Sequence, residues 1–241
     1  MDAPLAHCRG LGPAAFAITR ESGHPLVETC IALLSDPELD YERSPLARFH
    51  AAFQPRNAAE IMGLPSSHAG LQGAPETWRF PWMSASARNV QKRKRLSPKH
   101  REKGAGFAYF GPTSPEKGRS DLARLKAVVA AISADGFRLL PGVDGLVRAE
   151  ILSSGAEWRA RVQVGQHRTA ALAALGGTAV PIWPQPVVVR REEAADWPAV
   201  RDGVVTREEA LDIFDRMFEA VQPAALDRAK LSPPAAAASA A

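Results

Sequence analysis

The sequence predicts a mixed α/β fold of the α+β type, with a small mixed sheet and flanking helices that follow a helical N-terminal extension. Between residues 24 and 64, apolar residues recur at helical spacing. Short β-type runs alternate with two helical patterns between residues 107 and 190. These observations predict four regions: a helical extension with an aromatic loop and a basic segment (1–105), an α/β core (106–195), a helix packed on the core (196–222) and a disordered tail (223–241).

Composition is that of an ordinary globular protein. The chain has 241 residues, of which 46% are hydrophobic, and this can furnish a core. Its two cysteines, Cys8 and Cys30, show neither a disulfide framework nor metal-ligand spacing. The N-terminal residues lack a secretory pattern, and no apolar run approaches the length of a membrane span. We therefore expect a cytoplasmic protein without a metal site of its own or a membrane partner.

The extension begins with three short helical patterns. Leu46, Phe49 and Phe53 share one helical face, and the spacing of residues 27, 31 and 34 predicts another. Residues 65–87 mix Gly, Pro and Ser with aromatic side chains, which predicts an irregular loop held by those aromatics. Its Trp-Arg-Phe-Pro-Trp sequence is more typical of packing than of substrate binding.

The charge of the chain is concentrated in residues 88–103. That segment carries eight Lys or Arg against one acid, a local charge of +7, which leaves −3 for the rest of a chain of net charge +4. It could close over an acidic ligand, contact nucleic acid or remain a solvated loop, and the last is the commonest role of such a run. Because it contains no aromatic residue, base stacking is not supported, and nucleic acid is not the favoured partner.

The core opens with a predicted strand at 107–110 and a well-signalled helix. Ser114 suits the N-cap, Pro115 the first helical position and Glu116 the positive end of the helix dipole. Gly136 suits the C-terminal cap. The apolar stripe of this helix consists of Leu122, Leu125, Val129 and Ile132.

Strands are predicted at 137–140 and 146–152, around an Asp144-Gly145 turn, and at 159–164. An alanine-rich helix follows Gly165 and ends at a glycine pair, before two further strands at 179–183 and 186–190. The last helix starts with a capping box at residues 206–209. Its apolar stripe consists of Leu211, Phe214, Phe218 and Val221.

The turn Gly165-Gln166-His167-Arg168 carries the clearest chemical signal. A strand that ends in Gly and opens into a helix aims backbone N–H groups and the helix dipole at whatever lies above the turn, which favours phosphate. Arg and His side chains add hydrogen-bond donors there. The same residues also fit a plain tight turn whose polar side chains face solvent.

The run VGQHRTAALAALGGTAVPIW, residues 164–183, resembles the signature of the ParB/sulfiredoxin superfamily. That signature combines a strand, a Gly-x-His/Arg-Arg turn, an Ala-rich helix, Leu-Gly and a Val-Pro strand. The resemblance covers residues 107–189, about a third of the chain, and implies the fold of that superfamily and nucleotide binding. The superfamily includes CTP-binding partition proteins, ATP-using sulfiredoxins and small-molecule kinases, so it does not imply one reaction.

Departures from these branches narrow the expectation. Sulfiredoxins place a reactive cysteine where this chain has Gln166, so sulfinic-acid reduction is not expected. Partition proteins continue into a helix-turn-helix domain, whereas only about fifty residues follow Arg190 here. The small-molecule kinases fit best, since they combine a Gly-x-His-Arg turn with a glutamate near the start of the upstream helix. Glu116 has that place, although an acid in the first turn of a helix ordinarily stabilises the dipole.

The resemblance therefore implies a nucleotide-dependent phosphotransferase, a kinase that uses ATP or another nucleotide, with Mg²⁺, to phosphorylate a small hydroxylated acceptor. Other parts of the chain are similar to proteins of bacterial surface-polysaccharide loci, which makes a sugar one acceptor class beside amino acids. The alternative is a non-catalytic module that senses nucleotides or binds nucleic acid. The expected site consists of catalytic Glu116 and His167, phosphate-binding Gly165, Gln166, His167, Arg168 and Thr169, and accessory Ser114, Lys117 and Arg119.

Overall fold

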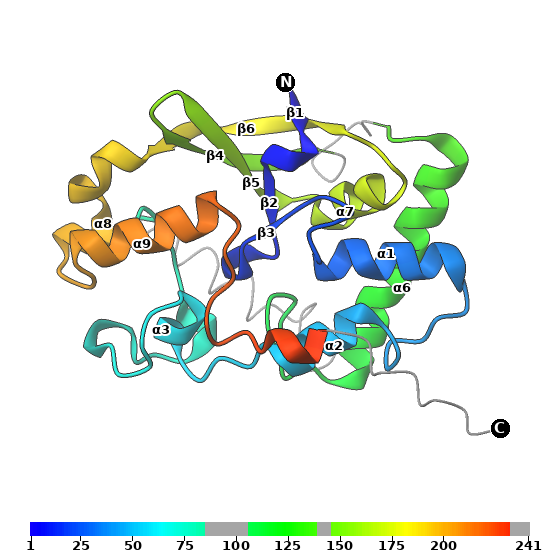
Figure 1. Ribbon diagram of the computed structural model, residues 1–241, viewed down its shortest axis with the longest axis horizontal. Helices are drawn as coiled ribbons and strands as arrows, with labels where there is room; N and C mark the ends of the chain where they lie inside the picture. The colour runs from blue at the N-terminus through cyan, green and yellow to red at the C-terminus, as the bar shows by residue number, and fades with distance from the viewer. Residues whose placement is uncertain (85–105, 139–145, 232–241) are drawn as a thin grey trace.

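The computed structural model describes residues 1–84, 106–138 and 146–231, and there the chain forms a six-stranded, curled mixed sheet with helices against one side (Figure 1). The strand order is β1-β6-β4-β5-β2-β3. The β4–β6 and β2–β5 pairs are parallel and the other neighbours are antiparallel. The strands are β1 (Asp2–Pro4), β2 (Cys8–Gly10), β3 (Phe16–Ala17), β4 (Val147–Ser154), β5 (Glu157–Val164) and β6 (Ala179–Arg190). This architecture confirms the mixed α/β class.

The centre of the sheet is the β4–β5 hairpin and its neighbour β6, all of which the sequence predicts. Val147 and Ala149 of β4 and Ala160 and Val162 of β5 are buried, as alternation along half-buried strands requires. Two separate strands were expected at 179–183 and 186–190, but β6 is continuous. A register shift opposite Ala149 and Ile151 lets this proline-containing strand continue, because proline cannot donate to a regular ladder.

The N-terminal region is not only helical, and the expectation of a helical extension is wrong for residues 2–4, 8–10 and 16–17, which form strands. β1 pairs with the start of β6, while β2 joins β5 and carries β3 on its other side. Each of these strands has two or three residues, which is too short for a periodic hydrophobic pattern. The extension and the predicted core thus share one sheet.

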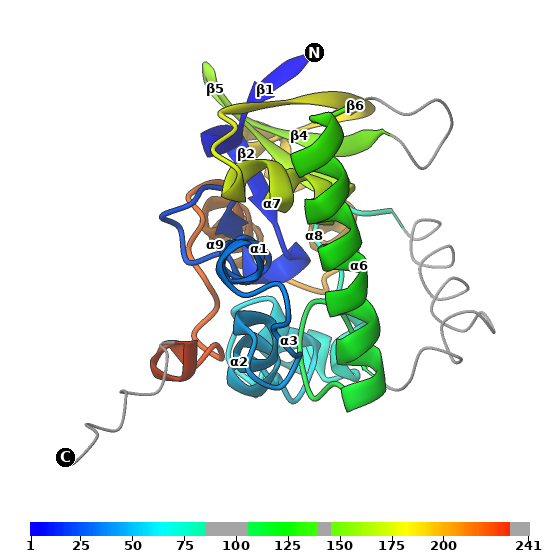
Figure 2. The ribbon, with the colours of Figure 1, turned by 90° about the vertical axis from the view of Figure 1, so that its right-hand side faces the viewer.

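The predicted helices are present, and α6 stands alongside α1 and α7, with which it packs (Figure 2). The α-helices are α1 (Pro25–Ser35), α2 (Pro45–Ala52), α3 (Ala58–Ile61), α6 (Pro115–Asp135), α7 (Gln166–Ala174), α8 (Pro198–Arg201) and α9 (Arg207–Phe218). Short 3-10 helices are η1 (Leu5–His7), η2 (Gly12–Ala14), η3 (Ala69–Leu71), η4 (Pro75–Thr77), η6 (Arg191–Asp196) and η7 (Arg228–Leu231). None of these helices is both long and apolar enough to cross a bilayer.

The caps and buried faces of the helices largely follow the sequence. The Ser114 hydroxyl accepts from the Lys117 N–H at 3.3 Å, and the Thr206–Glu209 capping box is formed. Leu46, Phe49 and Phe53 are buried together. In α1 the predicted face is confirmed at Val27, which is buried, and in part at Ile31, but it is wrong at Leu34, which is 43% exposed. The buried face of α1 also includes Leu26, Cys30 and Leu33.

One predicted strand is absent from the described residues, and a second is described only in part. Residues 107–110 form an irregular segment in which Phe107 and Phe110 stack at 4.7 Å. Gly111 N–H donates to the Phe53 carbonyl at 2.7 Å, which ties this segment to the end of α2 instead of to the sheet. Residues 137 and 138 are not in a strand, and the rest of that predicted strand, the turn at 144–145 and the basic segment lie outside the described residues.

The aromatic loop packs, as its sequence indicates. Trp78 and Phe80 are buried, and Phe80 stacks on Trp82 at 4.7 Å. Trp82 in turn contacts Trp197 and Phe214. These aromatics therefore fix the loop between the sheet and α9.

The C-terminal region is more ordered than its composition predicts. α9 buries Ile213, Phe214, Met217 and Phe218, but Val221 is 49% exposed because the helix ends before it. Leu226 is buried and forms a β-bridge with Phe53. The expected disorder from residue 223 is thus wrong up to Leu231, and residues 232–241 lie outside the described residues.

Candidate functional site

The predicted turn lies where β5 ends and α7 begins. Gly165 has φ +91°, in the left-handed region, and caps the helix. Its carbonyl accepts from the Thr169 N–H at 2.9 Å and from the Thr169 hydroxyl at 3.0 Å, so Thr169 is a buried structural residue. The first three N–H groups of α7 have no carbonyl partner within the helix and can meet a ligand.

Gln166 holds the turn to the N-terminal strands. Its side-chain oxygen accepts from the Leu11 N–H at 2.6 Å, and its amide nitrogen donates to the Val162 carbonyl at 3.1 Å. Leu11 itself has φ +53°, a conformation that non-glycine residues adopt at a cost of about 1–3 kcal/mol. Gln166 therefore positions the loop around Leu11, and its side chain is engaged within the protein.

A cavity of about 220 Å³ opens above this turn. It lies between the start of α7, the adjoining part of α6 and the segment that precedes α6. Its lining residues are Leu11, Leu26, Leu46, Ala108, Tyr109, Asp121, Arg124, Gln163, Val164, Gly165, Gln166 and His167. The cavity thus combines an apolar wall with polar groups of both charges.

Three charged side chains of α6 approach this cavity. Asp121 and Arg124 line it, and Lys117 forms an ion pair with Asp121. Among the described residues, Arg124 forms no ion pair or hydrogen bond. Its guanidinium is therefore available to an anionic ligand beside the start of α7.

His167 lines the same cavity and is uncharged at neutral pH. Burial above all, together with the nearby positive charge of Arg124, lowers the pKa of its imidazole to about 4. His24, which is fully buried against α1, also has its pKa lowered, chiefly by burial. A neutral imidazole can donate one hydrogen bond to a phosphate oxygen and gains a full charge if the ligand stabilises its protonated form.

This pKa makes anion binding depend on pH. The complex should hold the His167 proton more tightly than the free protein does, so affinity should rise as pH falls and level off below the free pKa of about 4. We expect sulfate, which stays a dianion throughout, to bind about tenfold more tightly at pH 5.5 than at pH 7.5. The charged and titratable groups that face His167 are His24, Lys117, Asp121 and Arg124.

Calorimetric titration with sulfate checks this dependence. The His167→Gln variant keeps a donor but cannot be protonated, so its affinity should vary much less between the two pH values. An equally steep dependence in the variant would assign the proton to another group.

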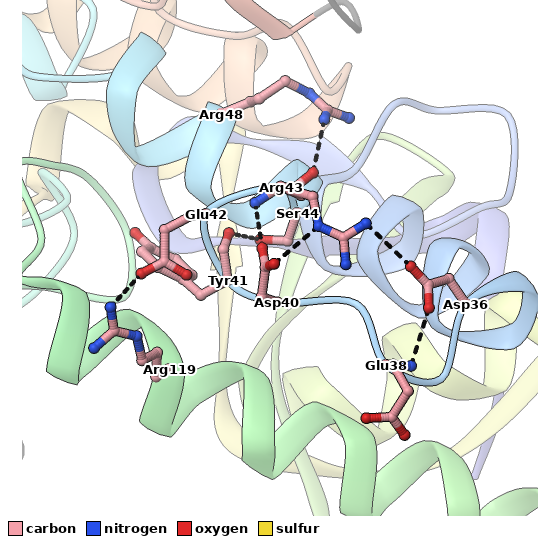
Figure 3. A network of polar contacts seen from close by, with 9 residues as sticks. All are labelled: Asp36, Glu38, Asp40, Tyr41, Glu42, Arg43, Ser44, Arg48 and Arg119. Atoms are coloured by element: carbon pink, nitrogen blue, oxygen red, sulfur yellow. Dashed lines mark hydrogen bonds and ion pairs between the residues drawn. The ribbon is translucent and has the colours of Figure 1, made fainter.

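The other predicted site residues lie away from the cavity. Glu116 is exposed, and its pKa is lowered by its own backbone N–H and by Ser114, as in an ordinary first helical turn. Arg119 forms an ion pair with Glu42, which lies in the connection between α1 and α2 (Figure 3). The distance between the Arg119 nitrogen and the Glu42 oxygen is 2.6 Å. Ser114 caps α6. The structure therefore does not bring these three residues to the turn.

Arg168 also points elsewhere. Its guanidinium lies 4.5 Å from the centre of the Phe137 ring and donates to the Arg138 carbonyl. Successive residues of a helix are about 100° apart, so His167 faces the cavity while Arg168 faces the end of α6. Of the predicted residues, the structure brings Gly165, Gln166 and His167 to the cavity, with Lys117 beside it.

Sequence reasoning missed Asp121 and Arg124. With Lys117 they occupy positions i, i+4 and i+7 of α6, a charged stripe beside its apolar one. That spacing was available in the sequence, but only the packing of α6 on α7 shows that the stripe faces the turn.

Comparisons with protein-family models, curated proteins and solved structures find no match for this chain. The resemblance to the ParB/sulfiredoxin superfamily consequently remains an expectation carried by the motif at residues 164–183.

Proposed function

We propose that the cavity binds the phosphate groups of a nucleotide and that the protein is a phosphotransferase acting on a small hydroxylated acceptor. The observation that carries the proposal is the convergence of the α7 N-terminus, the neutral His167 and the unpaired Arg124 on one cavity, within the described residues. Helix N–H groups and a guanidinium are the donors that phosphate oxygens prefer. The motif resemblance supports the same ligand class.

The size of the cavity suits the phosphates better than a whole nucleotide. Its volume of about 220 Å³ is below the roughly 300–1,000 Å³ of pockets that enclose drug-sized ligands. The base and ribose would then lie along the outer surface. An acceptor must be small, such as a monosaccharide or an amino acid, to reach the terminal phosphate.

In the proposed reaction, the acceptor hydroxyl oxygen forms a bond to the terminal phosphorus. The bond from that phosphorus to the bridging oxygen breaks, the nucleoside diphosphate leaves and the hydroxyl proton passes to a carboxylate or to water. His167 and Arg124 would stabilise the charge on the transferred group. Glu116, outside the cavity, is not placed to take the proton, whereas Asp121 lines the cavity.

A second candidate function is a non-catalytic nucleotide-sensing module. The exposed position of Glu116 favours it, because this is the residue on which the kinase expectation placed catalysis. In a sensor, nucleotide would bind with no loss of its terminal phosphate in the presence of any acceptor.

The first experiment is thermal unfolding with ATP, ADP, CTP and GTP, each with and without Mg²⁺. A ligand that binds only the folded state raises the melting temperature. We expect a rise with at least one nucleotide, and a loss of affinity of about 10- to 100-fold for Arg124→Ala or His167→Ala, since a hydrogen bond to a charged group contributes about 1.5–3 kcal/mol.

Arg119→Ala is the matched control, because Arg119 lies on the same helix but pairs with Glu42. Its affinity should equal that of the wild type. No rise with any nucleotide at millimolar concentration would contradict the proposed ligand. Transfer of labelled phosphate from the nucleotide to monosaccharides or amino acids then distinguishes a transferase, which labels an acceptor, from a sensor, which does not.

A further inference from the structure

Asp121 supplies the carboxylate that lines the cavity in the part of the chain that the structure describes. Its side chain is 15% exposed, and its Oδ2 atom accepts from the Lys117 ammonium one turn earlier. The other carboxylate oxygen, Oδ1, has no hydrogen bond among the described residues. The carboxylate is thus held by one oxygen and has the other available beside the cavity.

The charges around the cavity do not balance those of a nucleotide. Lys117 and Arg124 each carry one positive charge and Asp121 one negative charge, which leaves a net charge of +1. A nucleoside triphosphate brings several negative charges, and enzymes that bind it usually neutralise part of this with a metal ion. A cation placed between Asp121 and the phosphates would supply the missing charge.

We infer that Asp121 is a Mg²⁺ ligand that forms its site together with the bound phosphates, an inference that rests on the proposed nucleotide binding. Mg²⁺ typically takes one or two carboxylates, phosphate oxygens and several waters, and does not need a cage made by the protein alone. The described residues fit this mode, since they contain one carboxylate at the cavity and no cluster of three or more metal-binding side chains.

The competing interpretation is that Asp121 serves only to hold Lys117. An i,i+4 pair of this kind is common on helix surfaces and contributes little to stability when it is exposed. This pair differs from such surface pairs in its burial, because the exposed fraction is 12% for Lys117 and 15% for Asp121. The two interpretations differ in one observable, the effect of Mg²⁺ on nucleotide affinity.

The test is calorimetric titration of the full chain with ATP in Mg²⁺ and in EDTA. In the wild type we expect Mg²⁺ to tighten ATP binding at least tenfold. In Asp121→Asn, which keeps a hydrogen-bond acceptor for Lys117 but loses the charge, we expect that ratio to fall to about twofold or less, with affinity in EDTA equal to or above that of the wild type. Glu116→Gln makes the same change on the exposed side of α6 and should keep the wild-type ratio.

Asp121→Glu keeps the carboxylate and should retain part of the Mg²⁺ effect even if Asp121→Asn proves unstable. Binding of Mn²⁺ in the presence of ADP, followed by electron paramagnetic resonance, measures the metal directly and needs no turnover. An unchanged ratio in Asp121→Asn, or no Mg²⁺ effect in the wild type, overturns the inference while nucleotide binding stands. No ATP binding in either buffer overturns the proposed function itself and the inference with it.

Discussion

Replacing Glu150 with Ala should lower the free energy of unfolding by about 3–5 kcal/mol, because it leaves a buried cation without its partner. Glu150 Oε2 lies 2.8 Å from both Nε and Nη2 of Arg161 and also accepts from the Trp82 indole N–H at 2.8 Å. The side chains of Arg161 and Glu150 are only 6% and 13% exposed. The Arg161 guanidinium also lies 4.6 Å from the centre of the Phe80 ring, so the ion pair is joined to the aromatic loop.

Urea unfolding at neutral pH measures this loss. Glu157→Ala is the control, since Glu157 pairs with Arg159 but is 68% exposed, and its removal should cost less than about 1 kcal/mol. The double variant Glu150→Leu/Arg161→Met removes both charges together and should recover much of the stability that Glu150→Ala loses. Equal losses for Glu150→Ala and Glu157→Ala would show that the Glu150–Arg161 pair is hydrated.

The features that could be predicted from the sequence are those with local causes. Ser114 and Pro115 start α6 because a hydroxyl cap and a fixed φ act within one helical turn. Gly165 marks the turn because only a few residues adopt its left-handed conformation. Such signals need no knowledge of what the helix packs against, and they locate the cavity at the start of α7.

The features that could not be predicted depend on contacts distant in sequence. β1 is held by β6 and β2 by β5, about 150 residues or more away, and β3 is held in turn by β2. None of these short strands leaves a periodic pattern of its own. The choice between Glu116 and Asp121 depends on how α6 is rotated against α7, since the two acids are five residues apart on different faces of one helix. The sequence motif therefore predicts the position of the turn, but only the packing of α6 on α7 shows which acid lies beside it.

Substituting Gly165 with Ala should cost about 2–5 kcal/mol of stability and abolish sulfate binding in the protein that remains folded. The left-handed backbone at φ +91° contributes about 1–2 kcal/mol of this with any other residue. A Cβ atom would also lie 2.9 Å from Val147 Cγ2 and 3.2 Å from Val147 Cα, and overpacking of this kind costs about 1–3 kcal/mol more. Relief of that overlap must move β4 or the turn, which would redirect the N–H groups of α7.

Gly155 provides the matched control, because it also has a left-handed φ, +56°, but a Cβ there would meet nothing within 4 Å. Gly155→Ala should therefore lose only the backbone contribution of about 1–2 kcal/mol and keep wild-type sulfate affinity. Adding Val147→Ala to Gly165→Ala relieves the overlap with the Val147 side chain but leaves the close approach to its backbone. The double variant should therefore recover part of the sulfate binding that Gly165→Ala loses. Val147→Ala alone measures what that substitution itself costs in stability. If Gly165→Ala and Gly155→Ala lose equal stability and both bind sulfate, the packing of β4 against the turn does not set the geometry of the site.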